Sequence, residues 1–81
     1  MFYYTYVLLS LKDKMFYIGW TENLRDRIKE HKKGIVYSTK NRLPLKLIYF
    51  EGCLNKGLAI TREKQLKTGF GRAYIKRRLN F

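Results

Sequence analysis

The sequence has few of the residues that build covalent or metal cross-links. Cys53 is its only cysteine and His31 its only histidine, which excludes an internal disulfide and a zinc site made of Cys and His ligands. No run approaches the roughly 20 consecutive apolar residues that a membrane-spanning helix needs. The N-terminus has neither the basic start nor the small-residue cleavage site of a signal peptide. We therefore expect a cytoplasmic protein with no membrane partner, in which Cys53 is a small core residue.

Acidic residues are also scarce. The 81 residues include 6 Asp or Glu against 18 Lys or Arg, for a formal net charge of +12. Such an excess favours a polyanionic partner, and nucleic acid is a more common one than a membrane surface. A basic structural protein of a ribonucleoprotein is the simpler alternative. A chain of this length can build one core, so the sequence predicts a single small domain over residues 1–81.

The stretch Phe16-Tyr17-Ile18-Gly19-Trp20-Thr21 marks a sharp change from strand to helix. Residues 3–10 alternate in the manner of a strand, and a second strand is predicted over 15–19 after the Lys-Asp-Lys turn, so the two form an antiparallel hairpin. We expect Tyr6 and Tyr17 on the same side of this hairpin. Gly19 is expected to let another backbone or a phosphate come close.

The rest of the chain predicts three helices and one more strand. The first helix is expected over 22–33, with Thr21 as its N-cap and Gly34 as its C-cap. Residues 35–44 show no period and are read as a polar, basic loop that can contact a ligand. The remaining elements are a strand over 45–51, a helix over 56–68 capped by Asn55 and stopped at Gly69, and a helix over 72–79. The predicted fold class is α+β: a small three-stranded antiparallel or mixed sheet flanked by helices, in the order β-β-α-β-α-α.

The acidic residues differ in what they indicate. Glu22, Asp26 and Glu30 recur every fourth residue among basic residues, which is typical of a solvated, ion-paired helix face. Glu63 is the only acid after Cys53, and two interpretations are open. It forms an ion pair with Lys67 one turn later, or it is a single ligand for a hard cation such as Mg²⁺, which often takes only one or two protein carboxylates.

Four separate elements together resemble the GIY-YIG nuclease family, in particular its short stand-alone bacterial members, over nearly the whole chain. They are Tyr4-Thr5-Tyr6, Tyr17-Ile18-Gly19, the helix segment from Leu24 to Arg27 with His31, and Arg62-Glu63-Lys64. The first motif departs from its namesake, since Tyr4-Thr5 stands where the family has Gly-Ile, but it keeps the phenol.

The resemblance implies that Tyr6 and Tyr17 are the tyrosines of the two motifs, Arg27 the helix arginine and Glu63 the metal-binding glutamate. It implies a divalent-metal-dependent endonuclease that hydrolyses DNA phosphodiester bonds with one Mg²⁺ or Mn²⁺ ion, in DNA repair, recombination or processing. A hydrogen bond from Tyr17 and nearby positive charge would favour the phenolate of Tyr6 as a base for the attacking water. Taken singly, each residue also has a simpler role: the tyrosines pack the sheet, and Arg27 pairs with Glu30.

Further residues are candidates for the same site or for its partner. His31 is either a second polar site residue or a packing histidine, and Tyr37 is a candidate for stacking on a base or binding a phosphate. Residues expected to contact nucleic acid are Lys40, Arg42, Arg62, Lys67, Arg72 and Lys76.

The competing interpretation is a nucleic-acid-binding module on the same fold that is catalytically weak or inactive, since phosphate neutralisation alone supplies affinity. We expect no attached DNA-binding domain, and therefore weak or structure-based selectivity for single strands, flaps or branched DNA, or else a partner protein that supplies targeting. RNA is the alternative to DNA as substrate.

Overall fold

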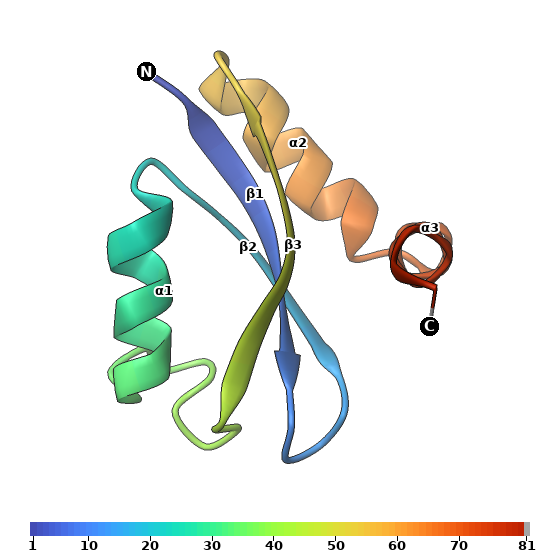
Figure 1. Ribbon diagram of the computed structural model, residues 1–81. Helices are drawn as coiled ribbons and strands as arrows, with labels where there is room; N and C mark the ends of the chain where they lie inside the picture. The colour runs from blue at the N-terminus through green and yellow to red at the C-terminus, as the bar shows by residue number, and fades with distance from the viewer. Residues whose placement is uncertain (81) are drawn as a thin grey trace.

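The computed structural model describes residues 1–80; Phe81, the last residue of the predicted domain, lies outside this range. The elements are β1 (Tyr3–Ser10), β2 (Phe16–Thr21), α1 (Leu24–Lys33), β3 (Leu45–Cys53), α2 (Lys56–Leu66) and α3 (Gly69–Leu79). This confirms the predicted order β-β-α-β-α-α. In Figure 1 the sheet is seen nearly edge-on, with α1 on one face and α2 and α3 on the other.

The strands form one sheet in the order β2-β1-β3. Both pairings are antiparallel, which settles the choice between an antiparallel and a mixed sheet. The central strand β1 places Tyr6 opposite Gly19 on one side and opposite Phe50 on the other. Because successive side chains of a strand point to opposite faces, Tyr6 faces α1 while Val7 faces α2 and α3.

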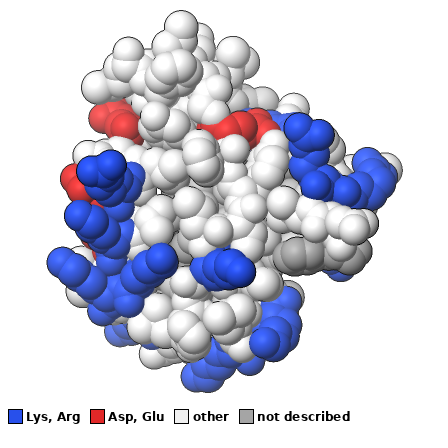
Figure 2. All heavy atoms as spheres, in the orientation of Figure 1, with Lys and Arg blue, Asp and Glu red and all other residues white. Residues whose placement is uncertain are grey.

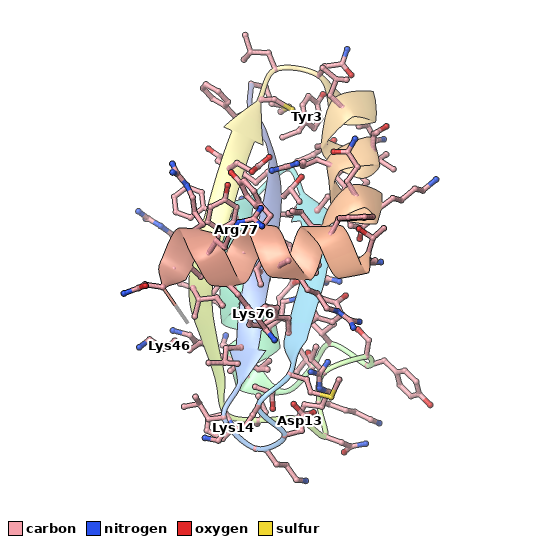
Figure 3. The ribbon with its side chains drawn as sticks, turned by 90° about the vertical axis from the view of Figure 1, so that its right-hand side faces the viewer. Tyr3, Asp13, Lys14, Lys46, Lys76 and Arg77 are labelled. Atoms are coloured by element: carbon pink, nitrogen blue, oxygen red, sulfur yellow. The ribbon has the colours of Figure 1, made fainter. Side chains whose placement is uncertain are left out.

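Each face of the sheet has its own core cluster. Tyr6, Leu8, Ile28 and Leu45 are buried under α1, and Val7, Ile18, Leu66 and Ile75 are buried under α2 and α3. Both faces of β1 are therefore at least partly buried. Figure 3 shows α3 running across the strands rather than along them.

The start of α1 differs from the prediction. The helix begins at Leu24 instead of Glu22, and its N-cap is Asn23, whose Oδ1 accepts the backbone N–H of Asp26 at 3.2 Å. Thr21 is still the last residue of β2, and its hydroxyl accepts the N–H of Asn23 at 3.1 Å. The chain needs residues 22 and 23 to leave the sheet before it can turn into a helix. Gly34 is the C-cap as predicted, with φ at 78°.

The boundary between α2 and α3 was also predicted wrongly. Asn55 caps α2 as expected, but α2 ends at Leu66 and Gly69 is the first residue of α3 rather than a stop. Thr68 is the N-cap of α3, because its hydroxyl accepts the N–H of Gly71 at 3.1 Å. A Ser or Thr side chain favours such a cap over a helix interior, and the two glycines concealed this signal in the sequence.

One smaller expectation also needs correction. Cys53 is half-buried at the end of β3 rather than a core residue. Among residues 1–80, no helix is long and apolar enough to span a membrane.

Candidate active site

A buried chain of hydrogen bonds runs from the centre of the sheet into the loop over residues 34–44. The hydroxyl of Tyr6 is hydrogen bonded to Nε2 of His31 at 2.8 Å, and Nδ1 of His31 is hydrogen bonded to the hydroxyl of Thr39 at 2.7 Å. All three residues are almost completely buried. Since each hydroxyl can donate or accept, either neutral tautomer of the imidazole is satisfied. His31 is therefore a polar partner of Tyr6 as well as a packed residue.

The pKa values of Tyr6 and His31 keep both side chains uncharged near neutral pH. Burial, with a further contribution from the positive charge of Arg27, lowers the pKa of His31 to about 4. Burial raises the pKa of Tyr6 to about 12, although the Arg27 guanidinium acts in the opposite direction. The expectation that Tyr17 and positive charge favour a phenolate at Tyr6 is therefore not met. The hydroxyl of Tyr6 stays protonated, and its hydrogen-bond partner is His31 rather than Tyr17.

Gly19 explains how the phenol of Tyr6 reaches this position. A Cβ at residue 19 would lie 2.6 Å from the hydroxyl oxygen and 2.7 Å from Cζ of Tyr6. Any side chain there would collide with the ring, so a bare backbone lets the ring lie across β2. The close approach predicted at Gly19 is present, but a phenol makes it rather than a backbone or a phosphate.

Tyr17 lies on the same side of the hairpin as Tyr6, as predicted. It pairs with Leu8 in the register, so it is diagonal to Tyr6, with 6.4 Å between the ring centroids. Its ring centroid is 5.1 Å from that of His31. Its hydroxyl accepts a hydrogen bond from Ser38 at 3.3 Å, which places the loop against the site.

Arg27 and Glu63 bring opposite charges to the same phenol. The guanidinium of Arg27 lies 3.0 Å from Glu30 and also interacts with the Tyr6 hydroxyl, which helps to raise the pKa of Arg27. Glu63 comes from α2 in the opposite layer, and its charge contributes to the raised pKa of Tyr6. The simpler roles are thus also present, since Glu63 lies 3.4 Å from Lys67. The Glu63 side chain is nevertheless only 17% exposed, against 55% for Lys67.

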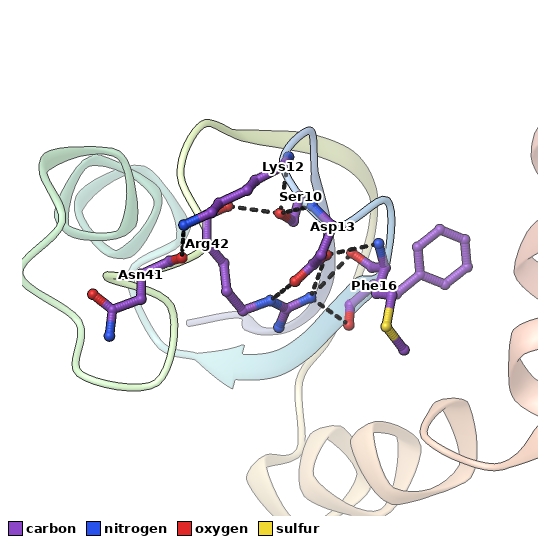
Figure 4. A network of polar contacts seen from close by, with 7 residues as sticks. Ser10, Lys12, Asp13, Phe16, Asn41 and Arg42 are labelled. Carbon is purple, nitrogen blue, oxygen red and sulfur yellow. Dashed lines mark hydrogen bonds and ion pairs between the residues drawn. The ribbon is translucent and has the colours of Figure 1, made fainter.

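Two of the arginines predicted to bind nucleic acid are occupied by ion pairs. Arg42 contacts Asp13 at 2.7 Å and donates to the carbonyl oxygens of Met15 and Phe16 (Figure 4). This contact lowers the pKa of Asp13 to about 2. Arg62 contacts Glu51 through two nitrogens, at 2.7 and 3.3 Å. Arg42 therefore ties the loop to the β1–β2 hairpin, and Arg62 ties α2 to β3.

The other predicted nucleic-acid residues lie in different places. Tyr37 is 83% exposed, with the ammonium of Lys40 4.8 Å from its ring centroid. Arg72 and Lys76 of α3 line a separate shallow groove beside Met15, on the side of the sheet shown in Figure 3. Lys67 contacts the carboxylate of Glu63 at 3.4 Å.

Sequence reasoning missed Ser38 and Thr39. Both were seen only as part of a polar loop, because the segment has no period. The signal available in the sequence was a pair of hydroxyl residues close to the apolar Val36. In the structure Val36 and Thr39 are both buried. Which groups these hydroxyls meet depends on the path of the loop. Contacts with the β1–β2 hairpin, among them the pair between Arg42 and Asp13 and the hydrogen bond from Ser10 to the Arg42 carbonyl, hold the loop in place.

The donor set of the site restricts the cation that it could hold. Within residues 1–80 no group of three or more His, Cys, Asp or Glu is arranged to bind a metal ion. Glu63 offers one largely shielded carboxylate beside Tyr6. One carboxylate fits a hard cation that takes its other ligands from water and a substrate phosphate. It does not fit an ion that demands a full set of protein ligands.

The fold and the site together define a class of protein. A three-stranded antiparallel sheet carries a tyrosine on each of two adjacent strands, and helices add an arginine and a glutamate to the same site. This is the arrangement of a GIY-YIG-type catalytic domain. The chain belongs to the GIY-YIG family: the model described as the GIY-YIG catalytic domain matches residues 2–80. The family is one of nuclease domains, so it implies a nucleic-acid substrate, and its members generally use a divalent metal ion.

Individual relatives support the same placement. The chain is 46% identical over 65 residues to a UPF0213 protein of Clostridium perfringens, a match covering 79% of this chain and 69% of the relative. It is 37% identical over 68 residues to a UPF0213 protein of Natronomonas pharaonis, covering 82% and 78%. The solution NMR structure of the UPF0213 protein BH0048 from Bacillus halodurans is similar with a TM-score of 0.57 and 28% identity, covering 93% of this chain and 82% of that one.

Proposed function

We propose that this chain is an endonuclease that hydrolyses DNA phosphodiester bonds with one Mg²⁺ or Mn²⁺ ion. The observation that carries the proposal is the meeting of Tyr6, His31, Arg27 and Glu63, from three separate elements of the fold, around one phenol. A sheet needs no such group of polar side chains for packing. Membership of a family of nuclease domains supports the same conclusion.

Tyr6 and His31 supply the proton chemistry. With a pKa of about 12 the phenol is a poor base alone, but the neutral imidazole 2.8 Å away can take its proton. Tyr6 then accepts a proton from the attacking water while it passes its own to His31. Arg27 is one cause of the low pKa of His31, so a phosphate that neutralises Arg27 makes His31 a better acceptor.

Arg27 and Glu63 supply the charge. The side chain of Arg27 is 38% exposed, so its guanidinium can exchange Glu30 for a phosphoryl oxygen and stabilise the negative charge that grows in the transition state. Glu63 would hold the divalent cation. When bound, the cation supplies charge stabilisation at the phosphate and its leaving oxygen.

Selectivity follows from what surrounds the site. We propose weak or structure-based selectivity among DNA substrates, in repair, recombination or processing, with a partner protein as an additional source of targeting. One observation favours a second candidate, a binding module without catalysis. Arg27 and Glu63 both have ion-pair partners, and a domain that only binds would retain these pairs in the complex.

Cleavage of labelled duplex, single-stranded and branched DNA, and of RNA, with Mg²⁺ or Mn²⁺ tests the proposal. We expect metal-dependent cutting that falls about 10²- to 10⁴-fold in Tyr6→Phe, the range for loss of a general base, and that is lost in Glu63→Gln. Asp26→Asn, which removes an exposed acid of α1, is the matched control and should cut normally. If wild type binds every substrate but cuts none, the binding module is the correct interpretation.

A further inference from the structure

Three aromatic side chains form a row on the α1 face of the sheet, beside Tyr6 and toward the edge strand β3. The ring centroids of Phe2 and Tyr4 are 6.2 Å apart, and those of Tyr4 and Phe50 are also 6.2 Å apart. A Cβ at Gly52 would lie 3.2 to 3.3 Å from the Phe2 and Tyr4 rings, so both rings lie directly over the β3 backbone. Phe2 and Phe50 are about half exposed, at 51% and 52%. We call Phe2, Tyr4 and Phe50 the aromatic row.

A groove separates the aromatic row from α1. It has a volume of about 580 Å³, within the range of roughly 300–1,000 Å³ that small-ligand clefts occupy. Its apolar lining comes from Leu24, Ile28 and Leu47 beside Tyr4 and Phe50. Together the two walls give a cleft that presents aromatic rings to the solvent from the sheet side.

The helix wall of the groove is basic. Arg25, Lys29 and Lys32 line it, and their spacing of four and three residues puts them on one stripe of α1. No ion pair among residues 1–80 engages any of the three. Glu22 is the one acid in the lining. Figure 2 shows Lys and Arg gathered over α1, on the left of the view, beside a largely uncharged surface at the centre of the molecule.

We propose that this groove binds a single-stranded segment of nucleic acid, with a base against Phe50 and Tyr4 and the phosphates along Arg25, Lys29 and Lys32. The chemistry that recognises a single strand is the combination of the two walls. Aromatic rings stack on the π-face of any unpaired base, while cations follow the backbone. A duplex offers its phosphates to the cations, but its bases are already stacked on each other and cannot enter the groove.

The position of the groove relates it to the reaction centre. Phe50 is the cross-strand partner of Tyr6, whereas Arg27 and His31 project from a different side of α1 than Arg25 and Lys29. A nucleic-acid strand held in the groove therefore lies beside the active site, separated from it by about the spacing between two neighbouring β-strands. The inference rests on the nucleic-acid substrate of the proposed function, but not on catalysis, and it names the substrate class as DNA with an unpaired segment next to the bond that is cut.

Binding without metal separates this inference from cleavage. The probes are a labelled oligothymidylate and a duplex of the same length, titrated with protein and followed by fluorescence anisotropy. We expect Phe50→Ala to weaken binding of the single strand about tenfold, as loss of one stacked base does, and to leave duplex binding unchanged. Phe50→Leu keeps a larger apolar side chain and serves as a second variant if Phe50→Ala disturbs the fold. We expect it to weaken single-strand binding in the same way. Phe70→Ala removes a 92% exposed aromatic from α3 and is the matched control.

Several outcomes would overturn the inference. Wild-type affinity for the single strand in both Phe50 variants would show that no base stacks there. Equal losses of affinity for the single strand and the duplex would show that the groove contacts only the sugar-phosphate backbone. A dimer in light scattering at the titration concentrations that Phe50→Ala abolishes would assign the groove to a second copy of the chain. If the single strand binds through Phe50 and wild type cuts nothing with Mg²⁺ or Mn²⁺, the proposed binding groove is supported and the proposed endonuclease function is contradicted.

Discussion

The pKa of His31 is central to the proposed mechanism. There His31 accepts a proton from Tyr6, and with a pKa of about 4 it is a weak acceptor in the free protein. Burial is the larger cause of this low pKa, and the charge of Arg27 is the smaller one. The charge of Arg27 is the part that a phosphate can remove. In the free site the imidazole is thus neutral but weakly basic, and in the proposed mechanism a phosphate on Arg27 would increase the basicity of His31.

The first prediction follows from this balance. Because His31 is the only histidine, its Cε1–H signal in an NMR titration is unambiguous, and we expect it to titrate near pH 4 rather than near the ordinary value of about 6.5. A histidine with a lowered folded pKa binds its proton more readily in the unfolded chain. Its contribution to stability is therefore complete above about pH 6.5 and is lost as the pH falls toward 4.

The control for this titration uses two arginines of the same helix. Arg27→Gln removes the charge that faces His31 and should raise its pKa, whereas Arg25→Gln removes a charge from the other side of α1 and should leave it unchanged. A pKa near 6.5 in the wild type would mean that the imidazole is open to water. An equal rise in both variants would mean that net charge, rather than the Arg27 contact, sets the value.

At the scale of elements, the corner between α2 and α3 depends on one backbone contact. A Cβ on Gly71 would lie 2.4 Å from the carbonyl oxygen of Gln65 and from Cα of Leu66. Neither atom belongs to a flexible side chain, so the two helices would have to move apart. Ile75 and Leu66, both fully buried, meet in the core beneath this corner, and any separation would open that core.

We therefore expect Gly71→Ala to lower the free energy of unfolding by about 1–3 kcal/mol or more, the usual cost of overpacking. Gly69→Ala is the matched control two residues earlier, where an added Cβ meets nothing within 4 Å. It should be neutral or stabilise by about 0.4–1 kcal/mol, because alanine has fewer conformations to lose on folding. Urea denaturation measures both. Equal effects of the two substitutions would contradict the close helix packing.

The elements also show how far the sequence could be read. The strand over 3–10 was predictable because alternation reports which residues are buried, and Gly34 because a left-handed C-cap needs glycine. The second strand was predicted over 15–19 but spans Phe16–Thr21. The ends at Thr21 and Gly69 were not predictable, since they depend on where β2 leaves the sheet and how closely α3 packs on α2. The candidate site residues were predicted from the spacing of four motifs. Ser38 and Thr39, the hydrogen-bond partners of Tyr17 and His31, were not predicted, because they lie in a loop held by tertiary contacts such as the pair between Arg42 and Asp13.

For the whole molecule, the distribution of charge matters more than its total. Four of the six acids form ion pairs, with Arg27, Arg42, Arg62 and Lys67. The remaining cations of residues 1–80 lie without such a partner, and α1 carries several on one face (Figure 2). An ion-paired arginine contributes to the net charge as much as a free lysine does. It releases few counterions when a nucleic acid binds, because its own carboxylate already neutralises it.

The salt dependence of binding separates these two kinds of cation. For a single strand, log K falls with log salt by about 0.7 for each phosphate that the protein neutralises. We expect Lys32→Gln to reduce this slope by about 0.7. Arg42→Gln should leave it nearly unchanged, although both substitutions remove one positive charge from the chain. Anisotropy titrations of a labelled single strand over a range of salt concentrations give the slopes, at temperatures well below unfolding of either variant.

Equal reductions would mean that the pair between Arg42 and Asp13 opens when nucleic acid binds, and the loop that carries Ser38 and Thr39 would then be released from the hairpin in the complex. Unequal reductions would mean that the loop stays in place, so that the hydrogen bonds around His31 in the free protein are also those present when the substrate arrives.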